Sequence, residues 1–182
     1  MKIVRGYKTE LEPTPEQYVI LCQCAGIARY AYNYGLTRKQ EAHRNGEKTP
    51  YAVQLQKELT ARKHDDLPWL CDASKWVVQN SLRDLDTAFD NFFKKCALKK
   101  IGQWKGKCGY PRFKNKHSGR GSFRLDCPIH VFDGAVQLPK LGKIRLKEQA
   151  HIPTWGVKVL SATISEKAGR WFVSVQVQEE HA

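Results

Sequence analysis

The hydrophobic pattern of this chain changes its period in the middle. From residue 15 to about residue 101 apolar residues recur at helical spacing, and after residue 122 they alternate as in strands. Thr14 followed by Pro15 is a helix-start signal, and the apolar periodicity behind it predicts a helix to about Gly46. The pair Thr49-Pro50 and the later Ser74 are further start signals. Three amphipathic helices with short connections predict a small helical bundle.

Six short alternating segments follow residue 122, separated by turn signals such as Asp133-Gly134 and Ala168-Gly169. The segment from Lys2 to Glu10 also alternates and predicts a first strand. Short antiparallel strands favour a small barrel or curled sheet, because closure removes unpaired edges. We therefore expect an α+β fold in which the helices are inserted between the first strand and the others. The expected divisions are residues 1–12, 13–101, 102–121 and 122–182.

The segment Lys94–Arg124 holds eleven Lys or Arg residues and no Asp or Glu. The whole chain has 31 basic and 18 acidic residues, so removing this segment changes the formal charge from +13 to +2. Trp104, Tyr110 and Phe113 lie between its cations. Cations suit phosphates and flat rings suit bases, so nucleic acid is the first hypothesis. The alternative is a solvated loop that binds polyanions without selectivity.

Other function classes find little support in the sequence. The first residues lack the apolar run of a secretory signal, and no stretch has membrane-spanning length, so we expect a cytoplasmic protein without a membrane partner. The six cysteines are expected to be reduced, and Cys108 with His117 is a poor zinc candidate because close ligand pairs are missing. Asp84, Asp86 and Asp90 lie on one helix and are expected to be solvent-exposed charge. We predict no cofactor, no metal and no catalytic residue.

Six motifs resemble, in order along the chain, the OrfB/TnpB proteins encoded by bacterial insertion sequences. The first is Thr-Pro-Glu-Gln after a short strand, and a later one is Tyr-Pro-Arg-Phe-Lys within the basic segment. The motifs lie at residues 14–17, 31–33, 79–93, 110–116, 138–142 and 164–171. Each one is weak alone, but six in the right order are specific.

This resemblance implies an RNA-guided DNA endonuclease related to type V CRISPR effectors, in the bacterial cytosol or nucleoid. Its first half is a wedge-like β-barrel with a three-helix recognition insertion, which holds guide RNA and a short motif of double-stranded DNA next to the target. A RuvC-like nuclease half follows, and nothing in this chain matches it, so we expect no enzyme activity from this chain. The alternatives are one part of a split endonuclease completed by a separate RuvC-like chain, and a nuclease-lacking repressor that occupies DNA.

The family motif Lys-aromatic-x-x-Gln, which faces the target-adjacent duplex, matches Lys75, Trp76 and Gln79. A Gln amide can bond adenine, Lys reaches guanine or phosphate, and a ring packs on a thymine methyl. The alternatives to DNA contact are that Gln79 is an ordinary exposed residue of the helix and that Trp76 is a core residue. Tyr51 resembles a family DNA contact more weakly. The expected contacts to the nucleic-acid backbone are Lys105, Lys107, Arg112, Phe113, Lys114, Lys116, Arg120 and Arg124.

Overall fold

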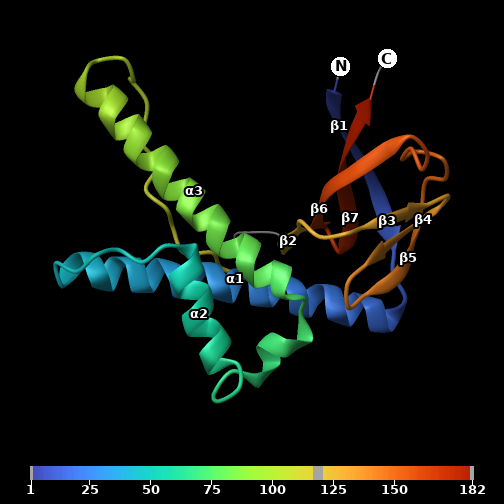
Figure 1. Cartoon of the computed structure of the whole chain (residues 1–182), viewed down its shortest axis with the longest axis horizontal. Helices are drawn as coiled ribbons and strands as arrows, with labels where there is room; N and C mark the ends of the chain where they lie inside the picture. The colour runs from blue at the N-terminus through green and yellow to red at the C-terminus, as the bar shows by residue number, and fades with distance from the viewer. Residues whose placement is uncertain (1, 117–120, 181–182) are drawn as a thin grey trace.

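The computed structural model describes residues 2–116 and 121–180, with side chains to residue 179. Its helical elements are α1 (Pro15–Arg44), α2 (Ala52–Arg62), the 3-10 helix η1 (Pro68–Asp72) and α3 (Lys75–Lys100). Its strands are β1 (Lys2–Glu12), β2 (Ser122–Leu125), β3 (His130–Phe132), β4 (Ala135–Leu138), β5 (Gly142–Leu146), β6 (Val157–Lys167) and β7 (Arg170–Glu180). The helices therefore lie between the first strand and the others in chain order, as expected (Figure 1).

The strands form one antiparallel sheet in the order β2-β6-β7-β1-β5-β4-β3. β1 pairs with β7 from Lys2 to Leu11, whereas only Leu11 and Glu12 pair with β5. The expected barrel is not confirmed: within the described residues the sheet is open, with β2 and β3 at its edges. The β2 edge is covered instead of closed, since Asn80 of α3 donates from Nδ2 to the Arg124 carbonyl at 2.9 Å.

Two helix starts match the sequence signals to different degrees. Thr14 and Gln17 form a complete capping box at α1: Gln17 N donates to Thr14 Oγ1 and Thr14 N to Gln17 Oε1. The start predicted at Thr49-Pro50 is wrong by two residues, because α2 begins at Ala52 behind Tyr51. The Pro50 carbonyl is used by another helix, since it accepts from Lys39 Nζ at 2.7 Å.

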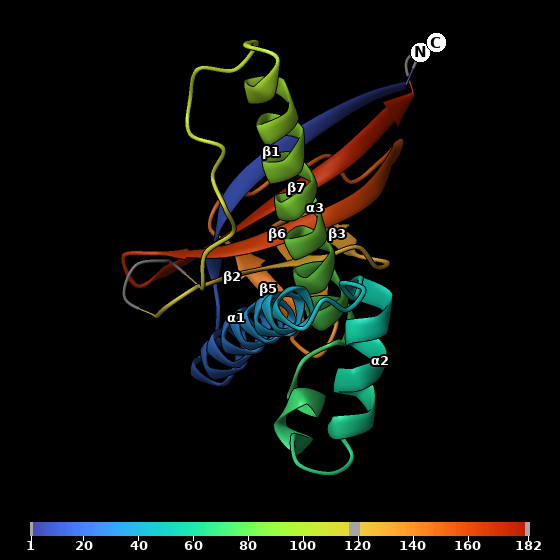
Figure 2. The same ribbon diagram turned by 90° about the vertical axis from the view of Figure 1, so that its left-hand side faces the viewer.

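The helices cross one another steeply and form no parallel-sided bundle (Figures 1 and 2). α1 and α3 meet at Gly35, where an added Cβ would lie 2.8 Å from Leu85 Cδ2. The buried residues of α3 lie between Val77 and Leu85, so only its first half packs into the body of the protein. Beyond Leu85, Phe89 still packs against Tyr32 and Leu36 of α1, and further along the helix its partner is a returning loop.

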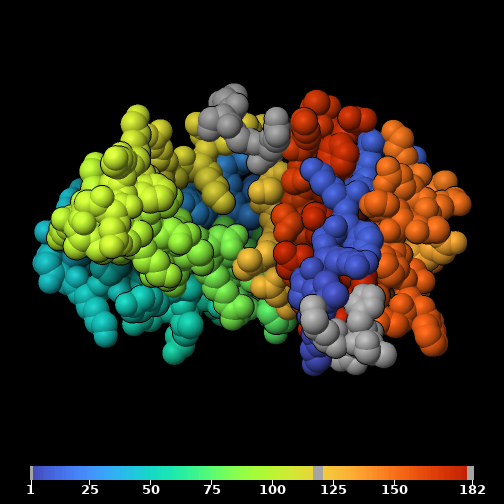
Figure 3. All heavy atoms as spheres, turned by 90° about the horizontal axis from the view of Figure 1, so that it is seen from above, coloured from blue at the N-terminus to red at the C-terminus, as the bar shows by residue number. Residues whose placement is uncertain are grey.

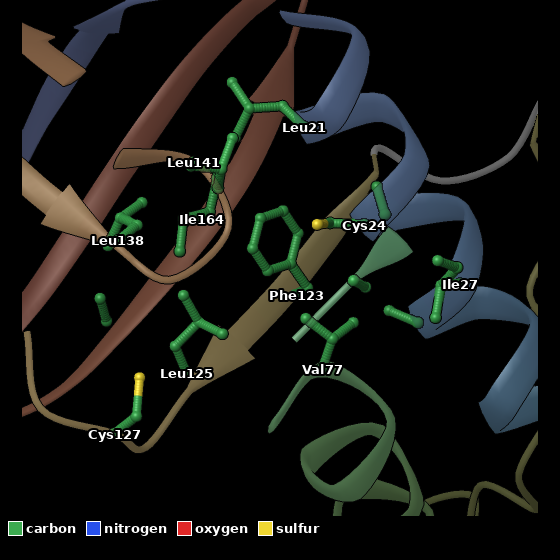
Figure 4. Packing of buried hydrophobic residues seen from close by; sticks show 14 of the residues in the cluster. Leu21, Cys24, Ile27, Val77, Phe123, Leu125, Cys127, Leu138, Leu141 and Ile164 are labelled. Atoms are coloured by element: carbon green, nitrogen blue, oxygen red, sulfur yellow. The ribbon is translucent and has the colours of Figure 1, made fainter. Parts of the chain in front are cut away.

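One hydrophobic core joins the helices to the sheet. Leu21, Cys24 and Ile27 of α1 face Phe123 and Leu125 of β2 (Figure 4). The same cluster includes Val77, Leu138, Leu141 and Ile164. Because helices and sheet share this core, the divisions at residues 12, 101 and 121 stay predictions. No helix in the described ranges is both long and apolar enough to span a bilayer.

Candidate nucleic-acid interface

The second half of α3 and the loop behind it, residues 87–116, form a projection that we call the arm. Figure 3 shows it (yellow-green) on the far side of the molecule from the orange strands. Tyr110 returns along α3 and meets the rings of Phe89 and Phe92 edge-on, at 5.6 and 5.2 Å between centroids. Phe93 remains 61% exposed. The loop is therefore folded back on the helix by ring packing.

The cations of the arm are left without carboxylate partners. In residues 94–116, all within the described part of the chain, no Lys or Arg lies within 4 Å of an Asp or Glu. Lys105, Lys107 and Arg112 are exposed. Trp104 is half-buried: Lys95 Nζ lies 5.4 Å from its ring centroid, and its Nε1 donates to the Lys107 carbonyl at 3.4 Å. The arm thus presents positive charge that no carboxylate of the described chain contacts directly.

Asn33 of α1 fixes the end of this loop. Its Nδ2 donates to the Lys114 carbonyl and its Oδ1 accepts from Lys114 N, both at 2.8 Å. Lys114 Nζ lies 4.2 Å from the ring centroid of Tyr32. Arg112, Phe113 and the neighbouring Lys116 are exposed on either side of this clamp. The side-chain amide of Asn33 therefore fixes the segment that carries these predicted contacts to the nucleic-acid backbone.

Asn33→Ala is expected to lower the free energy of unfolding by about 1–2 kcal/mol, because it removes both hydrogen bonds. Urea unfolding followed by circular dichroism measures this difference. Asn91→Ala is the matched control, since Asn91 is an exposed residue of α3 and experiences the same gain in helix propensity. Equal stabilities for the two variants would contradict the clamp.

Arg124 differs from the other predicted backbone contacts. Its Nη2 lies 3.3 Å from Asp84 Oδ1, and its Nε lies 3.4 Å from Asp126 Oδ1. The expectation that Asp84 and Asp86 are only solvent-exposed charge is therefore wrong: Asp84 pairs with Arg124, and Asp86 with Lys39 at 2.8 Å. Burial raises the pKa of Asp84 above its usual value, and the Arg124 charge opposes this shift. Arg120 and His117 lie outside the described residues.

Lys75, Trp76 and Gln79 occupy the first turns of α3. Lys75 is exposed and Gln79 half-buried, one turn apart on the same helix face. Trp76 is partly buried against the core, with Lys75 Nζ 5.4 Å from its ring centroid. Ser74 stands at the N-cap position, but its side chain makes no capping hydrogen bond. Lys75 and Gln79 are therefore accessible to a ligand, and Trp76 is divided between core and surface.

Tyr51 lies apart from that group. It precedes α2, where Asp86 Oδ2 accepts from Ala52 N, so it lies beside Asp86, about three turns of α3 from Lys75. Its side chain is 61% exposed, with Lys39 Nζ 5.4 Å from the ring centroid. The structure does not bring Tyr51, the arm, and the group Lys75, Trp76 and Gln79 into one pocket. These three sites are distributed along α3.

Within the described residues, no three His, Cys, Asp or Glu side chains are grouped so that they could hold a metal ion. Burial raises the pKa of the Cys24 thiol to about 12, so this cysteine stays protonated at neutral pH and is part of the core.

Sequence reasoning missed the polar residues that position the interface. In the sequence, Asn33 and Asn80 stand out only as parts of motifs. In the structure, Asn80 is completely buried and donates a hydrogen bond to the Arg124 carbonyl. Gln17 does more than cap α1, because its Nε2 also donates to the Leu141 and Lys143 carbonyls at 3.1 and 2.9 Å. The available signal was that each of these amide side chains lies inside a family motif. The groups that they bond are far away in sequence, so the sequence does not identify these partners.

Comparison with known proteins matches residues 1–48 to a helix-turn-helix domain of the IS605 OrfB type. Here those residues form β1 and α1, and the next helix begins at Ala52. InsQ of Escherichia coli (strain K12), named as a candidate RNA-guided DNA endonuclease, is 30% identical over 99% of this chain and 42% of its own length. A candidate RNA-guided DNA endonuclease of Streptomyces pristinaespiralis is 29% identical over 98% of this chain and 42% of its own.

The chain thus spans less than half the length of the curated relatives it matches. The similarity extends over its helices, its arm and its sheet together. The helix-turn-helix match and these relatives confirm the resemblance seen in the six motifs: residues 1–48 match a helix-turn-helix domain of the IS605 OrfB type, and nearly the whole chain is similar to part of two candidate RNA-guided DNA endonucleases.

Proposed function

We propose that this chain is the nucleic-acid-binding part of an OrfB/TnpB-type RNA-guided endonuclease. In this proposal it holds a guide RNA and reads a short motif in double-stranded DNA beside the target, and the cutting chemistry belongs to a part of the system outside these 182 residues. Its bacterial relatives, whose names state RNA-guided DNA cleavage, support this assignment.

The observation that carries the proposal is the arm with its uncompensated charge. Exposed Lys105, Lys107 and Arg112 have no carboxylate within 4 Å in the described chain, and the exposed rings of Phe93 and Tyr110 belong to the same arm. Free cations beside accessible rings are the pattern of proteins that bind phosphates and stack on bases. A loop that only aided solubility would not need Asn33 to fix its position.

Base reading is assigned to the start of α3. Lys75 and Gln79 point from one helix face and are accessible, which suits the insertion of a helix into a major groove. Trp76 contributes its exposed part, and Tyr51 makes a separate contact further along. Arg124 is assigned mainly to the link between β2 and α3, because Asp84 and Asp126 already share its charge.

The test is to purify the chain from a bacterial host and to sequence the RNA that copurifies with it. The proposal expects one enriched RNA and salt-dependent binding of that RNA by the repurified protein. Recovery of bulk host RNA in its cellular proportions, with equal affinity for unrelated transcripts, would instead identify an unselective polyanion binder.

Gln79→Ala is expected to relax base preference at one or two positions and to leave nonspecific affinity within about twofold, because the lost contact is to a base edge. Selection from a randomised duplex library, with RNA present, measures the preference. Gln23→Ala, a substitution at an exposed position of α1, is the control. Equal losses on selected and scrambled duplexes would show that Gln79 does not read sequence.

A further inference from the structure

The face of α1 that points away from the core carries a groove that adjoins the end of the arm at Asn33 and Lys116. Two adjoining hollows of about 230 and 520 Å³ share Gly26 and Arg29. The α1 residues along their floor follow one another at intervals of three or four, which makes one stripe of the helix. They are Tyr18, Cys22, Gly26, Arg29, Asn33 and Thr37. At 1.5 Å per residue the stripe is roughly 28 Å long.

Rings and cations line this α1 groove, and Trp69 lies next to one of the rings. Arg29 lies where the two hollows join, and Lys116 borders the first. Tyr30 and Tyr34 are nearly parallel, 20° apart with centroids separated by 6.3 Å, and Trp69 meets Tyr30 edge-on at 4.8 Å. Ordered rings beside guanidinium and ammonium groups are the features that single-stranded nucleic acids require.

The carboxylates near the groove already have partners. Glu166 borders the first hollow, and its Oε1 accepts from Gly169 N at 2.6 Å. Glu58 is bonded by Tyr34 Oη at 2.7 Å and by Arg38 Nε at 3.0 Å. Arg29 itself has no carboxylate within 4 Å among the described residues. Glu166 keeps its charge, because Gly169 N is neutral, but Arg29 and Lys116 outnumber it among the charged residues that line the two hollows.

We propose that the α1 groove holds one unpaired nucleic-acid strand, on a surface separate from Lys105, Lys107 and Arg112 of the arm. This inference rests on the proposed function, and it deepens it by naming a second surface and the form of its ligand. A single strand fits better than a duplex because its bases are free to stack on protein rings, whereas duplex bases stack on one another.

Gly26 provides a direct probe. A Cβ added there would meet nothing nearer than Arg29 Nη2 at 4.0 Å, so a side chain fits without disturbing the core, and replacing glycine favours the helix. Gly26→Glu puts a negative charge in the groove, and Gly26→Gln is its neutral match. Arg29→Gln removes the central cation, and Arg44→Gln at the exposed end of α1 is the charge-matched control.

Fluorescence anisotropy measures the affinity of the full chain for three labelled probes. These are a single-stranded RNA of twelve nucleotides, a single-stranded DNA of the same sequence, and the corresponding DNA duplex. Gly26→Glu and Arg29→Gln are expected to weaken single-strand binding about tenfold or more, with Gly26→Gln affected less and Arg44→Gln by less than about twofold. A loss of affinity for the single-stranded RNA alone, or for both the single-stranded RNA and the single-stranded DNA, supports the proposed role of the groove.

Wild-type affinity in both groove variants, while arm variants still lose binding, would overturn the groove and leave the proposed function standing. A loss confined to the duplex would overturn the assignment of a single strand. No binding of any of these probes by the wild-type chain would overturn the proposed function and this inference with it.

Discussion

Replacing Lys105, Lys107 and Arg112 together by glutamine is expected to weaken nucleic-acid binding by about 10–100-fold near 0.1 M salt. Each cation that neutralises a phosphate contributes about 0.7–0.9 to the slope of log affinity against log salt, so the slope should fall by roughly 2–3. All three residues lie on the arm and are exposed, and none has a carboxylate within 4 Å in the part of the chain that the structure describes. Lys114 is left unchanged because it packs on Tyr32.

The measurement is a titration of labelled RNA and of duplex DNA at four or more salt concentrations. The control is a triple glutamine variant with the same net charge. It replaces three exposed cations of the sheet and its turns, which are Lys140, Lys158 and Lys167. If both triple variants lose affinity equally, binding depends on net charge alone and the arm has no special role. An unchanged slope in the arm variant would exclude phosphate contacts by these residues.

Asp86→Ala should cause the largest loss of stability, about 3–5 kcal/mol in the free energy of unfolding. Lys39 is buried, with its Nζ 2.8 Å from Asp86 Oδ1 and 2.7 Å from the Pro50 carbonyl. The contact with Oδ1 is an ion pair without the alignment of a hydrogen bond. Asp86 Oδ2 also accepts from Ala52 N and so holds the start of α2. Removing the carboxylate leaves a buried ammonium without its counter-charge.

Urea unfolding measures this loss, which corresponds to a melting temperature lower by roughly 6–20 °C. Asp90→Ala, one turn further and exposed, is the control and should change stability by less than about 0.5 kcal/mol. Adding Lys39→Met to Asp86→Ala is expected to restore part of the stability, since the unpaired charge is then gone. If Asp86→Ala does not fold, Asp86→Asn with Lys39→Met tests the same coupling. Additive single effects would contradict it.

The elements of this fold could be predicted because their signals are local. Thr14 and Gln17 are three residues apart, so the capping box was visible in the sequence, and the strands after residue 122 followed from alternation and turn residues. The start of α2 was misplaced because the residue that stabilises it, Asp86, is 34 positions away. Local propensity contains no information about such a partner.

The candidate site divides in the same way. The charge of the arm was evident from composition, but the ion pair of Arg124 with Asp84 and the clamp of Asn33 on Lys114 join residues 40 and 81 positions apart. The groove on α1 was missed because Arg29 and Tyr30 resemble ordinary surface residues until α1 is placed beside Lys116 and Trp69.

The sequence by itself determined which segments are helices and strands, and where positive charge is concentrated, because both depend on neighbouring residues. Only the tertiary structure decided which charges remain free for a ligand, that the sheet stays open, and that α3 extends into an arm. Those outcomes depend on which distant groups meet, since a charge or a strand edge is satisfied only by a partner that folding brings to it.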